Sequence, residues 1–142
     1  MLGLCLAPVL LMGYAMTFQP ADRNHPSNVD GVVIEAMTCE KGLGFDAKAS
    51  TAGLFGFGLQ YGLPIFEETP VTLTFLPKAG LSYTTAPRHE LPQTAQFEVG
   101  GQLLLGYGPY RVGLEYWHLS NAGMQQPNLG LDMIVIQTGV AF

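Results

Sequence analysis

The stretch GLEYWHLSNAGMQQPNLGLDMIVIQTGVAF, residues 113–142, contains two alternating segments separated by residues that favour turns. Alternation indicates a β-strand, because successive side chains of a strand point to opposite faces. In the first segment, one face carries Leu114, Tyr116, His118 and Ser120. After residues 121–130, a second segment has a largely apolar face that consists of Asp132, Ile134, Ile136, Thr138, Val140 and Phe142. The stretch therefore predicts two strands joined by a loop.

His118, Ser120 and Asp132 lie at the loop-proximal ends of these strands, each on a largely apolar face. Polar groups in apolar surroundings cost free energy unless they satisfy one another. Residues two apart on a strand have Cα atoms about 6.6 Å apart, so the Ser120 hydroxyl can reach a ring nitrogen of His118. If the strands form a hairpin, Asp132 lies beside His118. This arrangement supplies a nucleophile, a base and a group that orients the base, as serine hydrolysis requires.

A site for acyl transfer also needs hydrogen-bond donors for the developing oxyanion. The segment between the two strands offers the side chains of Asn121 and Asn128 and the backbone N–H groups near Ala122. The same residues have a non-catalytic interpretation, since Ser-Asn-Ala-Gly is ordinary turn sequence and Asp132 can cap a loop. The spacing alone leaves both interpretations open.

The composition favours a sheet whose outer face meets lipid. Charged residues make up only 12% of the chain and hydrophobic residues 48%, with 18 glycines. No run of 18 or more apolar residues follows the N-terminus, which argues against a helical membrane bundle. The net charge of −5 and the total of six Lys and Arg residues argue against nucleic acid as a partner. Neither Cys5 nor Cys39 has a metal-ligand neighbour at a useful spacing, and no metal or cofactor is expected.

Bulky apolar residues alternate with glycine or polar residues along several further segments. In one of them, Phe55, Phe57, Leu59 and Tyr61 alternate with Gly56, Gly58, Gln60 and Gly62. A second segment, residues 71–83, is interrupted by Pro77, which predicts a bulge or an edge position there. A third spans residues 97–107.

This repeated pattern predicts an all-β fold, an antiparallel up-and-down transmembrane β-barrel of about eight strands. Inward glycines indicate a narrow barrel that is filled by side chains. In that interior, Glu115 is expected to pair with Arg111 or to hydrogen-bond to Gln137. A soluble β-sandwich or lipocalin-like barrel is the less favoured alternative, because its apolar faces would turn inward and leave Gly, Thr and Gln outside.

Residues 1–16 are apolar and end near small residues, which is typical of a secretory signal peptide. No Lys or Arg precedes the apolar run, so a retained hydrophobic or strand segment is the alternative. Residues 17–30 are polar and rich in Pro and Asn, which predicts a linker. The expected barrel domain, residues 31–142, is short for eight strands. It is either trimmed at the N-terminus or completed by residues before Asp30.

Residues 118–132, HLSNAGMQQPNLGLD, closely resemble the signature of the outer-membrane lipid A 3-O-deacylases, the PagL-like acyloxyacyl hydrolases. That family carries His-x-Ser-Asn-Ala-Gly, then a turn similar to Gln-Pro-Asn-x-Gly, then an acidic residue that opens the last strand. The resemblance is strongest over residues 113–142. Strand rhythm and loop placement extend it back to about residue 71.

The resemblance implies an eight-stranded membrane barrel with a catalytic site on its lipid-facing wall. Ser120 would be the nucleophile, His118 the general base and Asp132 the acidic member, with Asn128 and the Ala122 amide at the oxyanion hole. The implied substrate is the ester-linked 3-hydroxyacyl chain of lipid A, hydrolysed without a metal or cofactor. The family's acidic residue is often Glu. Asp is shorter by one methylene, so its pairing with His118 is expected to be closer or re-aimed.

Three functions remain as hypotheses. The first is a serine esterase that acts on lipid A in the bacterial outer membrane. The second is a non-catalytic structural barrel, or a phage virion or envelope component that retains the deacylase-like sequence. The third, a soluble lipid-binding barrel, is the least favoured. The expected partners are lipopolysaccharide and outer-membrane lipid, and a homodimer is one alternative for the oligomeric state.

Overall fold

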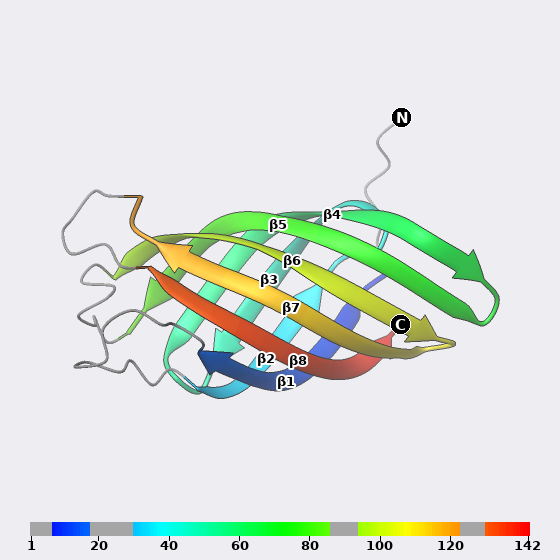
Figure 1. Cartoon of the computed structure of the whole chain (residues 1–142), viewed down its shortest axis with the longest axis horizontal. Coiled ribbons are helices and arrows are strands. Elements are labelled where there is room, and N and C mark those ends of the chain that lie inside the picture. The colour runs from blue at the N-terminus through cyan, green and yellow to red at the C-terminus, as the bar shows by residue number, and fades with distance from the viewer. Residues whose placement is uncertain (1–6, 18–29, 86–93, 123–129) are drawn as a thin grey trace.

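The computed structural model describes residues 7–17, 30–85, 94–122 and 130–142, which form a closed antiparallel barrel (Figure 1). Its strands are β1 (Val9–Thr17), β2 (Gly31–Met37), β3 (Gly42–Ser50), β4 (Leu54–Glu68), β5 (Val71–Thr84), β6 (Ala95–Tyr107), β7 (Tyr110–Ser120) and β8 (Leu131–Ala141). Each strand pairs with the next in sequence, and β1 pairs with β8 to close the ring. The predicted up-and-down barrel is confirmed. In the described part of the chain, no helix is long and apolar enough to cross a bilayer.

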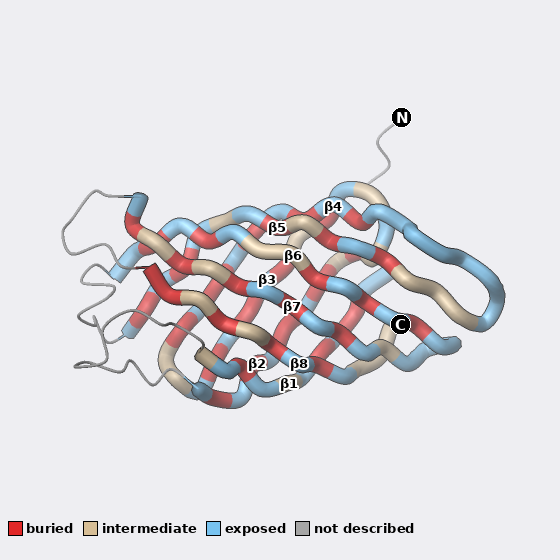
Figure 2. Tube along the Cα trace, in the orientation of Figure 1, coloured by how far each residue is buried: buried red, intermediate tan, exposed pale blue. Residues whose placement is uncertain are grey.

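Buried and exposed side chains alternate along most of the barrel wall (Figure 2), and most of the exposed ones are apolar. On β4, Phe57 is 60% exposed whereas Gln60, on the inward face of the same strand, is 2% exposed. Glycines occupy inward positions such as Gly56 and Gly58, as the sequence predicts. The outer wall is therefore apolar over most of its height, as a barrel that spans a lipid bilayer requires.

The N-terminal segment is part of the barrel. Residues 9–16, expected to belong to a signal peptide or to a retained hydrophobic or strand segment, form β1 together with Thr17 of the expected linker. This strand pairs with β8 over its whole length and with β2 from Val9 to Ala15. The expected barrel boundary at Gly31 is therefore wrong, since the structure includes a strand that begins at Val9. This strand completes the set of eight and removes the exposed edges that a seven-stranded sheet would leave. Most of the expected linker, residues 18–29, lies outside the described residues.

Buried charged residues fill the middle of the barrel. Lys48 lies 2.6 Å from Glu115 and 3.2 Å from Asp46. Lys78 pairs with Glu35 and lies 3.5 Å from Glu115. Their side chains are at most 2% exposed. The interior is thus filled by an ion-pair network that joins β2, β3, β5 and β7, and the prediction of a barrel filled by side chains is confirmed.

The expected partners of Glu115 are wrong. Glu115 pairs with the two lysines, whereas Arg111 pairs with Glu40 at 2.5 Å and Gln137 donates a hydrogen bond to Glu35 at 2.8 Å. The cause is geometric: Lys48 and Lys78 reach Glu115 across the interior from strands that are not its neighbours in the sheet.

Apolar clusters close the interior above and below this charged layer. Along β2, Val33 belongs to one cluster, Glu35 to the charged layer and Met37 to the other cluster. The cluster that contains Val33 also includes Trp117, Leu119, Leu131 and Met133 of β7 and β8. These buried residues alternate along β7 and β8 with the outward residues His118, Ser120 and Asp132. Their packing therefore fixes the height and tilt of both strands.

Pro77 lies inside β5 and is accommodated by an interruption in strand pairing. The β4–β5 pairs run through Gln60↔Lys78 and resume at Leu63↔Phe75, with no pair opposite Pro77 itself. A register shift follows between Pro64 and Phe66. The prediction of a bulge or an edge position at Pro77 is therefore wrong: Pro77 keeps its pair with Gly101 in the β5–β6 ladder, and the bulge lies on β4.

The two ends of the barrel differ in their connections. At one end, the strand connections span residues 38–41, 69–70 and 108–109. At the other end they span residues 18–30, 51–53, 85–94 and 121–130. In bacterial outer-membrane barrels, the short turns face the periplasm and the longer connections face the outside. The ends of β7 and β8 that carry His118 and Asp132 belong to the longer-connection end (Figure 1).

Candidate active site on the outer wall

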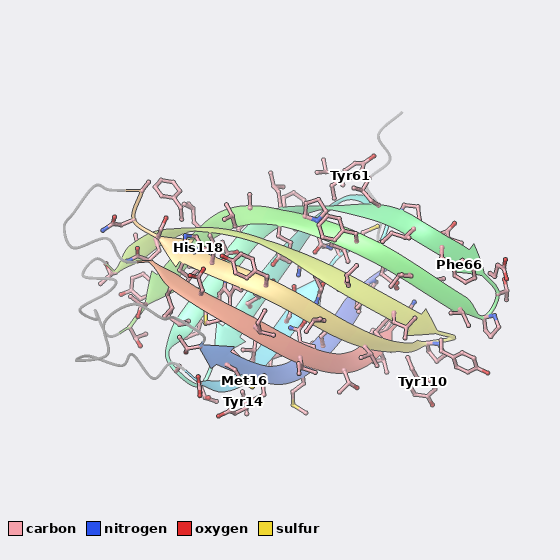
Figure 3. All side chains as sticks on the ribbon, viewed as in Figure 1. Tyr14, Met16, Tyr61, Phe66, Tyr110 and His118 are labelled. Atoms are coloured by element: carbon pink, nitrogen blue, oxygen red, sulfur yellow. The ribbon has the colours of Figure 1, made fainter. Side chains whose placement is uncertain are left out.

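His118 and Asp132 are direct partners in the β7–β8 hairpin. The Nδ1 atom of His118 lies 2.7 Å from Oδ1 of Asp132. Figure 3 shows His118 on the outer wall, near the end opposite to Tyr110 and Phe66. The sequence predicted that these two residues lie side by side if the strands form a hairpin. The strands do form a hairpin, and its register pairs His118 with Asp132.

Ser120 occupies the next outward position on β7, two residues beyond His118, and is half-buried. Its partner across the β6–β7 ladder is Phe97, and the partner of His118 is Val99. Phe97 and Val99 are 43% and 49% exposed. The serine therefore lies on the same face as the imidazole, at the strand end, beside apolar side chains that point outward.

Tyr116 is a further member of this group. Its hydroxyl donates a hydrogen bond to Oδ1 of Asp132 at 2.6 Å, the same oxygen that His118 contacts. Its ring is stacked on the His118 ring, with 6.5 Å between centroids and 16° between planes. The sequence placed Tyr116 on the face of His118 and Ser120 but assigned it no role. The signal was its spacing, two residues before His118.

Gly130 brings the backbone close to the imidazole. It adopts a φ of +69°, and a Cβ added there would lie 2.9 Å from Cε1 and 3.6 Å from Nε2 of His118. A left-handed backbone favours glycine, and here a side chain would also meet the ring. The edge of the imidazole opposite to Asp132 is therefore flanked by the start of β8.

The loop residues expected at an oxyanion hole have different positions. Ala122 directly follows the strand end and has a φ of +53°, an unusual conformation for a residue with a side chain. Asn121, next to the end of β7, is 0% exposed, and its expected role at the oxyanion hole stays a prediction. Asn128 lies outside the described residues.

The side chains of His118 and Asp132 are 29% and 27% exposed. They are open to the outside but partly shielded, so their mutual contact is stronger than a fully solvated ion pair. Among the described residues, no group of three or more His, Cys, Asp and Glu side chains is placed to hold a metal ion. The arrangement offers a base held by a carboxylate, with the Ser120 hydroxyl two residues further along the same face of β7.

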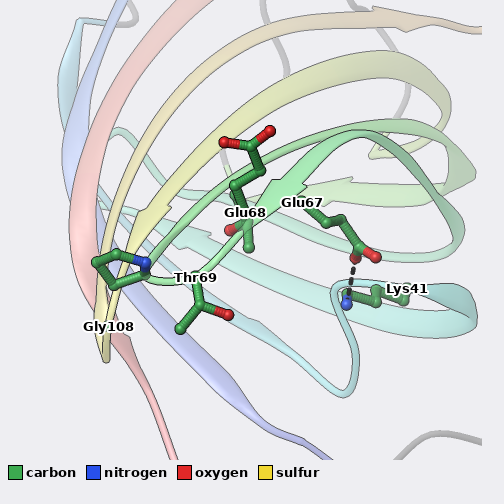
Figure 4. A pocket seen from close by; sticks show the side chains of 7 residues that line it. Lys41, Glu67, Glu68, Thr69 and Gly108 are labelled. Carbon is green, nitrogen blue, oxygen red and sulfur yellow. Dashed lines mark ion pairs between the residues drawn. The ribbon is translucent and has the colours of Figure 1, made fainter.

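A hollow lies at the opposite, short-turn end of the barrel (Figure 4). Its volume is about 460 Å³, and Lys41, Glu67, Glu68, Thr69 and Gly108 contribute to its lining. Lys41 and Glu67 form an ion pair there, and both side chains are exposed. No histidine lines this hollow, and one of its acidic residues, Glu67, is paired with Lys41. The His118–Asp132 pair on β7 and β8 is therefore the stronger candidate site.

A closed barrel with an apolar outer wall, a filled interior and a Ser, His and Asp group on that wall defines a membrane β-barrel with a candidate hydrolase site. Residues 16–141 match the model of the family described as lipid A 3-O-deacylase (PagL), and the chain belongs to that family. The fold and the family place it in the bacterial outer membrane.

Solved structures share the fold. The crystal structure of the outer membrane enzyme PagL aligns with a TM-score of 0.63 and 18% identity, over 94% of this chain and 99% of that one. The crystal structure of Ail, the attachment invasion locus protein of Yersinia pestis, aligns with a TM-score of 0.53 and 12% identity, over 98% and 100% of the two chains. A comparison with curated proteins gave no match.

Proposed function

We propose that this protein is a serine esterase that hydrolyses an ester-linked 3-hydroxyacyl chain of lipid A. The observation that carries the proposal is the 2.7 Å contact between His118 and Asp132 on the outer wall, with Ser120 next on the same face. Membership of the lipid A 3-O-deacylase family supports the substrate class. A structural barrel has no need to keep this polar group on an apolar wall.

In the proposed mechanism, Asp132 orients the base. An ionised carboxylate only accepts hydrogen bonds, so Nδ1 of His118 carries the hydrogen and Nε2 is free to accept one. Nε2 takes the proton of Ser120 while the serine oxygen attacks the ester carbonyl carbon. The resulting oxyanion is stabilised by backbone N–H groups near Ala122 and by Asn128.

Collapse of this intermediate breaks the bond to the sugar oxygen, which takes the proton from His118 and leaves as the alcohol. The fatty acyl group is then esterified to Ser120. A water molecule gives a proton to His118, attacks the acyl carbon and releases the fatty acid, while Ser120 recovers its proton. Hydrolysis thus regenerates all three side chains.

The surroundings of the group suit a lipid ester. Phe97 and Val99 flank Ser120 and His118 on β6 and remain exposed on the outer wall, where an acyl chain can lie against them. The site lies at the longer-connection end, so it meets the outer leaflet of the membrane. A water-soluble ester would have to enter the membrane to reach the same position.

Replacing either partner of the contact should reduce the rate far more than the stability. His118→Asn removes the base, and Asp132→Asn removes the carboxylate that orients it. In serine proteases, loss of the histidine costs about 10⁶-fold in kcat and loss of the aspartate about 10⁴-fold. Both side chains lie on the outer wall, so the free energy of unfolding should change by about 1 kcal/mol or less. Deacylation rates and urea unfolding of each variant would check this. A variant that loses its activity because the barrel is unfolded would contradict it.

Gly130→Ala should lower the rate by about 10²-fold, because the added Cβ displaces the His118 ring. Gly108→Ala is the matched control, since Gly108 has a φ of +56° and nothing lies within 4 Å of a Cβ added there. Both changes carry a similar backbone cost of about 1 kcal/mol. Steady-state kinetics on the two variants separate the contact from the strain. If Gly108→Ala loses as much activity as Gly130→Ala, then crowding of His118 is not the cause.

A further inference from the structure

We infer that Tyr116 is a positioning residue that holds Asp132 in the orientation required by His118. This inference rests on the proposed function, because it concerns the same site. Tyr116 neither carries the nucleophile nor accepts its proton, so its role acts through Asp132.

The first observation is that one carboxylate oxygen serves two donors. Oδ1 of Asp132 accepts the Tyr116 hydroxyl at 2.6 Å and lies 2.7 Å from Nδ1 of His118. A carboxylate held by a single donor can rotate about its side-chain bonds. A second donor on the same oxygen fixes that oxygen in place, and the tyrosine hydroxyl comes from the strand that carries the histidine.

The second observation is that the tyrosine ring also restrains the imidazole. The two rings lie 6.5 Å apart and are nearly parallel, at 16°. Tyr116 and His118 are successive outward residues of β7, so a single rigid strand sets both rings. The tyrosine thus contacts the carboxylate through its hydroxyl, and its ring lies nearly parallel to the imidazole.

The third observation is the length of the acidic side chain. Asp132 lies directly opposite His118 in the β7–β8 ladder. A short carboxylate at this position has little freedom to adjust its reach, so its contact with Nδ1 depends on the direction in which it points. Tyr116 supplies that direction.

The group is placed where such a restraint is needed. Asp132 and His118 are only about one quarter exposed, whereas Tyr116 is 40% exposed and forms their outward edge. Tyr116 thus both shields the contact between His118 and Asp132 and orients the carboxylate.

The test is Tyr116→Phe, which keeps the ring and removes only the hydroxyl. A hydrogen bond to a charged group is strong enough for its loss to lower kcat for lipid A deacylation by about 3- to 30-fold, with KM changed less than about twofold. In an Asp132→Asn background, the same change should cost less than about twofold, because the partner is already lost. Tyr110→Phe, on the outer wall at the opposite end, is the control and should keep full activity.

Labelling of Ser120 by a fluorophosphonate separates this inference from the proposed function, because the label reports an activated serine whatever the lipid substrate. If the wild type deacylates lipid A and Tyr116→Phe matches it in kcat, the inference is overturned and the proposed function stands. If the wild type leaves lipid A intact, the proposed function fails and labelling decides the role of Tyr116. Slower labelling of Tyr116→Phe than of the wild type then supports the inference. Equal rates, or no labelling of either protein, overturn it.

Discussion

Ser120→Ala should abolish deacylation while leaving the barrel folded. The substitution removes the only atom that the mechanism uses to attack the ester, and loss of the nucleophile in a serine protease costs about 10⁶-fold in kcat. Ser120 is half-buried at the outward end of β7, beyond the paired core of the hairpin, so alanine is accommodated there without a cavity. The expected result is a rate at background level for a purified, fully folded protein.

The measurement is the release of hydroxy fatty acid from lipid A vesicles by wild type and variant at equal protein concentration. The shift in electrophoretic mobility of the folded barrel on heating verifies that both proteins are folded. A Ser120→Ala protein that releases fatty acid at the wild-type rate would remove the nucleophile from the account. A Ser120→Cys variant is informative as well, since a thiolate can attack the same carbon.

Lys48→Met should cause the largest loss of stability of any single change considered for this protein. Lys48 is fully enclosed, 2.6 Å from Glu115 and 3.2 Å from Asp46, with its ammonium 4.9 Å from the centre of the Trp117 ring. Methionine keeps most of the volume but removes the charge. Leaving buried carboxylates without their cation costs about 3–5 kcal/mol. The free energy of unfolding should fall by that amount.

Lys41→Met is the matched control. Lys41 also forms an ion pair, with Glu67, but the two side chains are 56% and 43% exposed. Exposed pairs contribute about 1 kcal/mol or less, so this variant should unfold close to the wild type. Urea titrations of both variants in the same detergent micelles provide the comparison. Equal stabilities of the two variants would show that the interior network does not hold the barrel together.

Most of the fold could be predicted from local patterns. A strand of a membrane barrel turns its bulky apolar side chains outward and its small or polar side chains inward, and this alternation is visible in the sequence. Phe57, Leu59 and Tyr61 are bulky and apolar, and the residues between them are Gly or Gln. Alternation fixes which side chains share a face. Composition then indicates that the apolar face meets lipid, and the same two arguments apply to β6, β7 and β8.

The N-terminal strand shows where local pattern fails. Residues 9–17 have an apolar sequence that suits either a signal peptide or a strand of this barrel. Only the strands that pair with these residues distinguish the two alternatives. The pairing of β1 with both β2 and β8 resolves this, but that pairing is a property of the closed ring. The interior partners of Glu115 could not be predicted for the same reason, since Lys48 and Lys78 come from strands distant in sequence.

The sequence predicted the main pair of the candidate site, but it did not predict the tyrosine that hydrogen-bonds to this pair. His118 and Asp132 could be placed together because the hairpin register follows from two adjacent strands. The hydrogen bond from Tyr116 could not, because alternation gives a shared face and no side-chain direction. The burial of Asn121 could not be predicted either, because alternation no longer applies directly after the strand end.

The most direct test of the account is the mass of lipid A from cells whose outer membranes contain the wild-type protein, with Ser120→Ala as the paired sample. The account predicts that lipid A from the wild-type sample loses the mass of one ester-linked hydroxyacyl chain, and that lipid A from the Ser120→Ala sample does not. Identical lipid A masses in the two samples, with both barrels folded in the membrane, would contradict it.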